Sequence, residues 1–478
     1  MTTPARRQLK IGYSIWPTGH HRTAWRLPEA INTGTVDPAF LADSIKTAER
    51  GLFDYFFIGN SVKSDPRSAR ASGNEVFKIE GYTLAGYAAA LTEKIGVVVT
   101  INATYSDPYN TARAIASLDH LSHGRAGLNV VTGVSGSDAS ANFSSAAHPE
   151  THDKYEWAEE FTEVVYKLLN SWEPDWLVDD RENGVFLDPD KGLPIDHEGR
   201  FFSVRGPLNV PRPPQGRIPL IHAGTSEQSF EYGAKWADIR FSPYRGKDWN
   251  RDYYDNIKGR LDKYGRSTDD QFILPGFTFF VGDTTAEARA KYREVQRFNT
   301  SEYIPKVVSA FIGVDLSSIR ATEKVLDVLD PATLRVEAER AAERAGGLDS
   351  TGNTWTIDRY TGNKLWALDL ALDAYGGDET VTFRDLYNYI ANFPGNQAPV
   401  VGSGRDVADW IEERFENREI DGVKVFPPYS KYPLEAFVDL VVPELQRRGI
   451  FRTEYTTSTF RGHLGLPEDA HNDSVVPA

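Results

Sequence analysis

The sequence predicts an α/β protein of the (β/α)8 class, a TIM barrel, that carries insertions. The first observation behind this prediction is that short apolar runs, rich in β-branched and aromatic residues, recur between longer runs of helical periodicity. This alternation is typical of strand-and-helix units built around a parallel sheet. The second observation is that eight such apolar runs are present, as many as this barrel has strands. A barrel of this class places its functional site at the carboxyl ends of the strands.

Four strand-and-helix pairs are expected in the first part of the chain. The expected strands are the runs 9–15, 53–59, 95–103 and 126–132. Amphipathic helical patterns fill the segments after these strands, at 37–51, 81–94, 110–122 and 153–172.

Four more strands are expected in the remainder of the chain, at 218–224, 237–242, 272–282 and 421–427. The stretch VGSGRDVADWIEERF, residues 401–415, is rich in glycine near its start. It lacks the third glycine of a dinucleotide-binding fingerprint, so we expect a helix to begin there.

Two segments exceed what a barrel needs. Residues 173–217 are rich in Pro, Gly and Asp, and residues 283–400 hold several helical patterns separated by polar loops. We interpret both as insertions in one barrel domain that spans residues 1–478. The second insertion is long enough to form a lid, and a packed outer layer is an equally good interpretation.

The composition of the chain excludes several classes of function. The formal net charge is −15 and no block of Lys and Arg occurs, which argues against nucleic acid as a partner. No run reaches the roughly 18 apolar residues of a membrane helix and the first residues lack a secretory segment, so we expect a cytoplasmic protein without a membrane partner. The chain has no cysteine, which excludes disulfides and thiol nucleophiles. The ten histidines show no metal-binding spacing, so we expect no metal site.

Uncharged hydrogen-bonding residues dominate the expected strand ends. Such a lining suits a planar polar ring that is held by amides and hydroxyls, with the chemistry supplied by a cofactor. A hydrolytic barrel usually needs paired carboxylates at these positions instead. The strand-end candidates are Trp16, Asn60, Ser61, Ala103, Thr104, Asn129, Thr132, Gly224, Thr225 and Ser226.

The stretch HAGTSEQSFEYGAKWAD, residues 222–238, predicts a phosphate site. A strand ends at Gly224, Ser226 can cap the following helix, and Glu227 begins that helix. The free backbone N–H groups and positive dipole end of a helix start accept phosphate. An ordinary capped helix is the alternative interpretation.

Aromatic residues near the first three strand ends predict the substrate pocket. We expect Trp16, Phe57, Phe77 and Tyr105 to form its walls. With few cations nearby, such walls favour a neutral substrate that is aromatic or bears sulfur or halogen over a polycarboxylate. The opposite holds if the basic residues Arg22, Arg26, Lys63 and Arg67 fold inward.

The motif LDHLSHGRAGLNVVTG, residues 118–133, resembles the L-D-x-L-S-x-G-R segment and the following N-x-V-T strand of the bacterial-luciferase-like flavin monooxygenases. More narrowly, the chain is similar to the branch of nitrilotriacetate, EDTA and dibenzothiophene-sulfone monooxygenases. Further matching motifs extend over nearly the whole chain: AWR at 24–26, AERGLFDYFFI at 48–58, ATYSDPYNTAR at 103–113, YEWAEEF at 155–161, VRGPLNVPRPPQG at 204–216, HAGTSEQS at 222–229 and RTEYTTSTFRGHLGL at 452–466.

This resemblance implies a two-component monooxygenase. A separate NAD(P)H:flavin reductase would supply reduced FMN (FMNH2), and O2 would oxygenate a small organic substrate, often with cleavage of a C–S, C–N or C–halogen bond. A homo-oligomer is also expected. The implied cofactor-binding residues, drawn from the resemblance and from the strand ends, are Asn60, Thr104, Asn129, Thr132, Tyr155, Gly224, Ser226 and Glu227.

Two of these residues are also expected to be catalytic. Thr104 and Asn129 stand at neighbouring strand ends and offer donors to the flavin edge and to dioxygen. Donors placed there stabilise the charge that develops as oxygen is reduced. The competing hypothesis is a hydrolytic barrel that uses carboxylates such as Asp54, Glu80 or Asp119.

Overall fold

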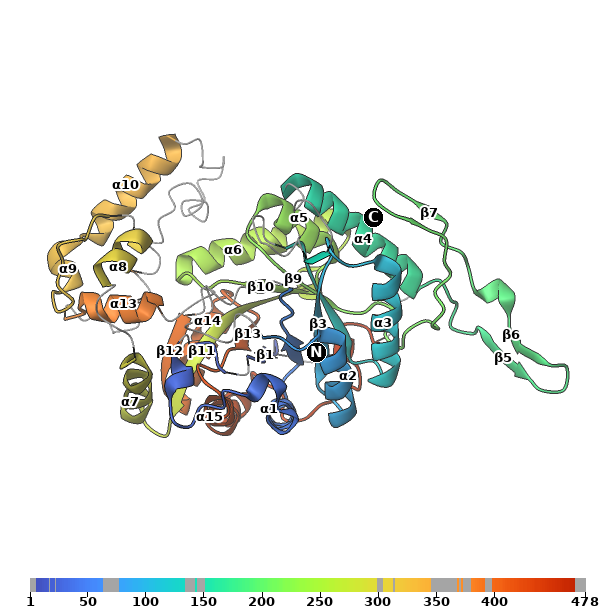
Figure 1. Ribbon diagram of the computed structural model, residues 1–478, viewed down its shortest axis with the longest axis horizontal. Helices are drawn as coiled ribbons and strands as arrows, with labels where there is room; N and C mark the ends of the chain where they lie inside the picture. Colours follow the sequence, from blue (N-terminus) through green and yellow to red (C-terminus); the bar gives the residue numbers. More distant parts are fainter. Residues whose placement is uncertain are drawn as a thin grey trace, which may run out of the picture.

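A closed parallel barrel forms the centre of the protein (Figure 1). The structure, a computed structural model, describes residues 6–468 except 17, 22, 63–76, 134–141, 144–150, 299–303, 313, 345–367, 369–370, 373–379 and 392–397.

All eight expected strands are present, and they follow one another round the barrel in chain order. The circle closes because β10 pairs with β11, β11 pairs with β13, and β13 pairs with β1. The barrel strands are β1 (Lys10–Ser14), β2 (Tyr55–Ile58), β3 (Gly96–Asn102), β4 (Ala126–Val131), β9 (Leu220–Ala223), β10 (Ile239–Ser242), β11 (Phe272–Gly282) and β13 (Gly422–Val425).

A further strand, which the sequence did not predict, extends the sheet. β12 (Ala398–Ser403) pairs with the second half of β11 in parallel register, from Phe277 opposite Ala398 to Gly282 opposite Ser403. The first half of β11 stays in the barrel wall beside β10. The long strand therefore belongs to the barrel at one end and supports the large insertion at the other.

Helices cover the outside of the barrel, and their ends follow the expected capping chemistry. Asp37, Asp107, Ser226 and Ser403 each accept backbone N–H groups at a helix start, and Ser403 forms a capping box with Asp406. The principal helices are α1 (Pro38–Arg50), α2 (Gly81–Leu91), α3 (Pro108–Leu121), α4 (Thr151–Leu169), α5 (Glu227–Trp236), α6 (Lys247–Gly259), α14 (Gly404–Glu416), α15 (Tyr432–Ala436) and α16 (Val442–Arg447).

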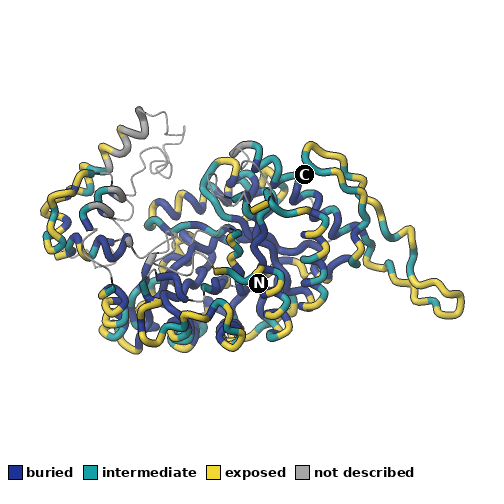
Figure 2. The backbone as a smooth tube through the Cα atoms, in the orientation of Figure 1, coloured by how far each residue is buried: buried dark blue, intermediate teal, exposed yellow. Residues whose placement is uncertain are grey.

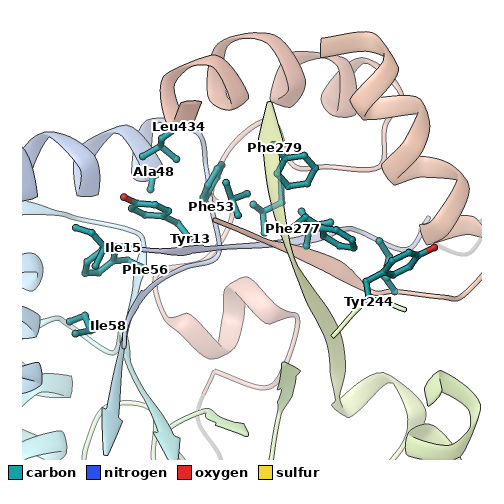
Figure 3. Close-up of a cluster of buried hydrophobic side chains, with 14 of the residues drawn as sticks. Tyr13, Ile15, Ala48, Phe53, Phe56, Ile58, Tyr244, Phe277, Phe279 and Leu434 are labelled. Carbon is teal, nitrogen blue, oxygen red and sulfur yellow. The ribbon is translucent and has the colours of Figure 1, made fainter. Parts of the chain in front are cut away.

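The main core lies between the strands and these helices (Figure 3). Tyr13 and Phe56, on neighbouring strands, are buried with their ring centroids 5.9 Å apart. Ala48 of α1 and Leu434 of α15 belong to the same cluster. This layer fixes the barrel wall and leaves alternate strand residues to face the interior.

A short C-terminal helix fills the amino-terminal end of the barrel. Phe460, which begins α17 (Phe460–Leu464), is completely buried beside Tyr55. A Cβ atom on Gly96 would lie 2.6 Å from the Phe460 ring, and one on Gly127 would lie 2.7 Å from it. The two glycines therefore leave the space that this ring occupies.

The insertions extend from opposite sides of the barrel (Figure 1). The first contains two antiparallel hairpins, β5 (Leu177–Asp180) with β6 (Val185–Leu187) and β7 (His197–Glu198) with β8 (Ser203–Val204). Figure 2 shows that much of the chain along these hairpins is exposed. The second insertion is helical and includes α7 (Thr285–Gln296), α8 (Ile304–Ile312), α9 (Val325–Val328), α10 (Pro331–Arg344) and α13 (Phe383–Ala391). Among the described residues, no helix has the length and hydropathy to cross a membrane.

Candidate active site

A cavity of roughly 820 Å³ opens at the carboxyl ends of the barrel strands, where the barrel prediction placed the site. This volume lies within the range of small-molecule and cofactor sites. Residues from β1 to β4, β9 and the segments that follow them form the wall. They are Ile15, Trp16, Phe57, Gly59, Asn60, Ser61, Val62, Lys78, Thr100, Asn102, Asn129, Val131, Thr132, Gly133, Lys154, Tyr155, His222, Ala223 and Gly224.

The wall formed by β3 and β4 is polar. Thr100 lies opposite Asn129 in the parallel register, and the Asn129 side chain donates from Nδ2 to Thr100 Oγ1 over 3.0 Å. Asn102 lies two residues beyond Thr100 and therefore faces the same side. This arrangement fixes amide and hydroxyl groups against the cavity without any charge.

His222 supports the adjoining wall, formed by β9, as a neutral imidazole. Its Nδ1 donates to the Val130 carbonyl over 2.8 Å, and its Nε2 lies 3.1 Å from Ser229 Oγ. Burial, followed by the charge of Arg240, lowers the pKa of His222 to about 3. A proton is therefore absent from Nε2 near neutral pH, and the ring anchors the end of β9.

Gly224 forms a tight corner between β9 and α5. Its φ is +136°, and a Cβ atom there would lie 2.4 Å from Ser229 Oγ and 3.5 Å from Tyr155 Oη. The first N–H groups of α5 follow this corner, and those at a helix start have no acceptor within the helix. Tyr155, Gly224 and the start of α5 together offer donors to an anionic group.

The structure brings seven of the residues predicted to bind cofactor or substrate together in the cavity wall, where the strand-end candidate Ser61 also lies. The seven are Trp16, Phe57, Asn60, Asn129, Thr132, Tyr155 and Gly224.

Five predicted residues lie outside this wall, each for a local reason. Thr104 donates its hydroxyl to the Thr132 carbonyl over 3.0 Å. Ser226 caps α5 by accepting from the Ser229 N–H, and Glu227 pairs with Arg260 through bonds of 2.5 and 3.1 Å. Phe77 is 67% exposed. The Tyr105 ring stacks on Phe143 with centroids 4.8 Å apart.

Sequence reasoning missed Thr100, Asn102, Lys78, Lys154 and His222 in the wall. Period-2 alternation along the expected strand 95–103 was the signal that could have identified Thr100 and Asn102. No local pattern distinguishes Lys78 or Lys154, because Lys78, three residues before α2, and Lys154, in the first turn of α4, reach the cavity only through the fold.

The expected scarcity of cations near the aromatic walls is wrong. Lys78 and Lys154 line the cavity, and the Lys78 ammonium lies 4.1 Å from the centroid of a Trp16 ring. Of the basic residues considered from the sequence, Arg26 instead packs on Phe298 at 4.6 Å. Arg22, Lys63 and Arg67 lie outside the described residues.

The carboxylates of the hydrolytic hypothesis have structural roles. Asp54 binds Arg452 and the Ile11 N–H, and Asp119 accepts from the Gln215 side chain over 2.6 Å. Glu80 caps α2 through the N–H groups of its first turn. None of the three is in the cavity wall, which contains no acidic residue among the described residues. Within the same part of the chain, no group of three or more His, Asp or Glu could hold a metal ion.

Comparison with known proteins agrees with this geometry. The model of the luciferase-like monooxygenase family matches residues 19–360. The N-acetyl-S-(2-succino)cysteine monooxygenase of Bacillus subtilis (strain 168) is 35% identical and covers 97% of this chain and 98% of its own. Component A of the nitrilotriacetate monooxygenase of Aminobacter aminovorans is 34% identical and covers 97% of both chains.

A solved structure gives the same result for the fold. A riboflavin lyase bound to modified FMN and riboflavin superposes with a TM-score of 0.75 at 27% identity, covering 98% of each chain. Sequence, barrel and cavity thus agree: the chain is a monooxygenase that belongs to the luciferase-like family.

Proposed function

We propose that this protein uses reduced FMN and O2 to oxygenate a small organic substrate. The observation that carries the proposal is the uncharged polar wall of β3 and β4, which faces a cavity of cofactor size at the barrel mouth. A family match over most of the chain gives independent support.

The residues present fit FMN. A Cβ at Gly224 would lie 2.4 Å from Ser229 Oγ, so only glycine allows this close turn beside Tyr155, and the N–H groups that follow at the start of α5 would suit one phosphate. Asn60, Asn129 and Thr132 would face the flavin ring along its polar edge. Ser226 would have an indirect role, because its hydroxyl caps the helix.

Bound FMNH2 supplies the electrons that activate O2. Asn129 would present its amide to the ring and to oxygen, where a fixed dipole stabilises developing negative charge. Thr104 would act indirectly, because its hydroxyl donates to the Thr132 carbonyl and not to the flavin. The described residues of the cavity wall also include no carboxylate, which would repel the negative charge that develops on oxygen.

We further propose that a separate NAD(P)H-dependent reductase supplies FMNH2 and that the chain assembles as a homo-oligomer. The nitrilotriacetate relative is named as one component of a monooxygenase, which supports the first part. Cleavage of a C–S, C–N or C–halogen bond is proposed as the outcome. The Trp16 and Phe57 walls support a substrate with an apolar part.

Anaerobic titration with FMNH2, reduced FAD and reduced riboflavin tests the cofactor assignment. FMNH2 is expected to bind more tightly than the other two, because the Gly224 corner accepts one phosphate. Turnover is then measured with a flavin reductase, O2 and a panel of thioethers, sulfones, aminopolycarboxylates and haloaromatics. Equal affinity for riboflavin and FMN would contradict the phosphate site, and no oxygenated product from any panel member would count against the activity.

A further inference from the structure

We propose that the side of the cavity lined by Trp16 and Phe57 holds a binding site for a carboxylate, built from Trp16 and from His20 and Lys424, which pack against these two rings. This inference rests on the proposed function in one respect, since it assigns the carboxylate to the monooxygenase substrate. Three observations carry it: a buried lysine and two buried polar nitrogens that have no hydrogen-bond partner among the described residues, and the position of this cluster on the barrel.

Lys424 lies inside the barrel and has no ionic partner in the part of the chain that the structure describes. Its ammonium lies 3.0 Å from the centroid of Phe57, 4.7 Å from that of Phe241 and 5.4 Å from that of Phe426. Its register neighbours on β1 and β11 are both glycines, Gly12 and Gly276, so aromatic rings fill the space around its side chain. Only 2% of the residue is exposed, and it forms no hydrogen bond or ion pair with any described residue.

Other buried lysines in this barrel do have partners. Lys10 donates to the His463 carbonyl over 2.9 Å, and Lys258 lies 3.0 Å from Asp421 Oδ2. Long charged side chains are rarely fully buried unless they are paired. Lys424 departs from the pattern that this protein itself follows, which is typical of a functional group.

His20 and Trp16 each contribute a buried nitrogen that lacks a hydrogen-bond partner among the described residues. These atoms are Nε2 of His20 and Nε1 of Trp16. The His20 ring lies between those of Trp16 and Phe426, at centroid distances of 4.2 and 4.1 Å. A buried polar group without a hydrogen-bond partner destabilises the protein, so a ligand that bonds to both nitrogens is favoured.

The cluster has no counter-ion among the described residues. Burial lowers the pKa of His20 well below its usual value, and the charges of Lys78 and Lys424 lower it further. Burial alone lowers the pKa of Lys424. No acidic side chain in the described part of the chain opposes either effect. A bound anion would accept hydrogen bonds from both nitrogens. It would also favour the protonated forms of His20 and Lys424, so that binding would take up a proton.

The topology separates this cluster from the phosphate corner. Trp16 and His20 follow β1 and Lys424 lies on β13, whereas Gly224 ends β9. In the closed order of the barrel, β9 lies four strands from β1 in either direction. A cofactor phosphate at Gly224 leaves the cluster to a second ligand, and Trp16 and Phe57 connect the cluster to the cavity.

The ligand is therefore a substrate with an apolar part against Trp16 and Phe57 and a carboxylate toward His20 and Lys424. A thioether acid has this chemistry. This assignment replaces the neutral substrate that the sequence favoured, because that preference depended on an absence of cations.

Calorimetric titration of the cofactor-free protein tests the site without any turnover. The probes are (phenylthio)acetate, its methyl ester, the matching sulfonate and inorganic phosphate, each in two buffers of unequal ionisation enthalpy. We expect the acid to bind at least about tenfold more tightly than the ester, with measurable proton uptake. Equal binding of acid and ester by the wild-type protein would overturn the proposal, and so would displacement of the acid by phosphate or tighter binding of the sulfonate.

Lys424→Met and His20→Gln should lose most of the preference for the acid and reduce the proton uptake. Arg26→Met removes one positive charge outside the cavity wall and should keep both properties. If Lys424→Met does not fold, Lys424→Gln takes its place, and a variant that keeps the full preference would contradict the site. FMNH2 titration of the same variants should show unchanged affinity. A protein that binds the acid but not FMNH2 would refute the proposed function while leaving the site intact.

Discussion

The Asn129 amide donates to the Thr100 hydroxyl over 3.0 Å, across two neighbouring strands and directly in register. This bond orients an uncharged dipole at the mouth of the barrel, in a cavity wall that contains no acidic residue among the described residues. A side chain held in this way needs no rearrangement when charge develops beside it.

Breaking this bond tests the orientation of Asn129. Thr100→Val keeps the shape of the side chain and removes the acceptor. We expect FMNH2 affinity to fall by about 1 kcal/mol, since a buried amide loses its partner. More FMNH2 should also be oxidised to hydrogen peroxide without product. Asn129→Ala should show the same two effects more strongly, and full coupling in both variants would remove this pair from the site.

Gly224→Ala tests the phosphate corner. The new Cβ would lie 2.4 Å from Ser229 Oγ at a φ of +136°, a conformation that L side chains rarely adopt. We expect a loss of about 1–3 kcal/mol in unfolding free energy and at least several-fold weaker FMNH2 binding. Gly265→Ala is the matched control, because its φ is +65° and no atom lies within 4 Å of its Cβ position. The control should lose stability by denaturant unfolding but keep its FMNH2 affinity.

Ser226→Ala distinguishes a capping role from direct phosphate binding. Ser226 Oγ accepts the Ser229 N–H over 3.2 Å, so its loss should lower the unfolding free energy by about 1 kcal/mol. Ser226→Asp should restore the cap while placing a carboxylate near the cofactor phosphate. A direct role predicts weaker FMNH2 binding for both variants, whereas a cap alone predicts rescue of stability and no common binding defect.

His463 should make the protein sensitive to acid. Its Nε2 donates to the Lys94 carbonyl and Nδ1 accepts from Thr457, and burial chiefly lowers the pKa of His463 to about 4. An unfolded histidine titrates near 6.5. The stabilisation is therefore complete above about pH 6.5 and is lost as the pH falls toward 4, up to about 3 kcal/mol. Between these pH values, denaturant unfolding of His463→Gln should depend less steeply on pH than that of wild type.

Phe460→Ala tests the closure of the amino-terminal end of the barrel. The ring is fully buried against Gly96 and Gly127, so its removal should lower the unfolding free energy by about 3–5 kcal/mol. Phe186→Ala is the matched control, because Phe186 lies on the exposed β5–β6 hairpin at 64% exposure. A change within about 0.5 kcal/mol is expected there. Equal losses of unfolding free energy in the two variants would show that the Phe460 ring does not stabilise the amino-terminal end of the barrel.

The barrel was predictable because its strands carry a local signal. Each apolar run indicates a buried strand from its own residues, before its neighbours in the sheet are known. The predicted strand 126–132, for example, agrees with β4 to within one residue at each end. β12 escaped prediction because APVVGS is short, begins with a small residue and a proline, and becomes a strand only by pairing with the long β11.

The candidate site was predictable where a residue stands on a strand end, as Asn129 and Gly224 do. Prediction failed for side chains whose direction is set by the turn after the strand. Thr104 and Tyr105 follow β3 in sequence, yet the turn directs them to Thr132 and Phe143. The role of Lys424 could not be predicted from the sequence. A lysine in an apolar strand can face the barrel interior or lie at the strand end, and only the strand register distinguishes the two.

The ring of Phe460 has a consequence for how the chain acquires its structure during synthesis. β1 can pair with β13, and Phe460 can enter the interior, only after more than four hundred residues have been added to the nascent chain. Translation proceeds at roughly 5–20 residues per second, so Tyr55, Val98 and Ile221 stay without their final cover for tens of seconds. Apolar surface exposed for that time favours aggregation, and the yield of folded protein should therefore depend on chaperones that bind the growing chain.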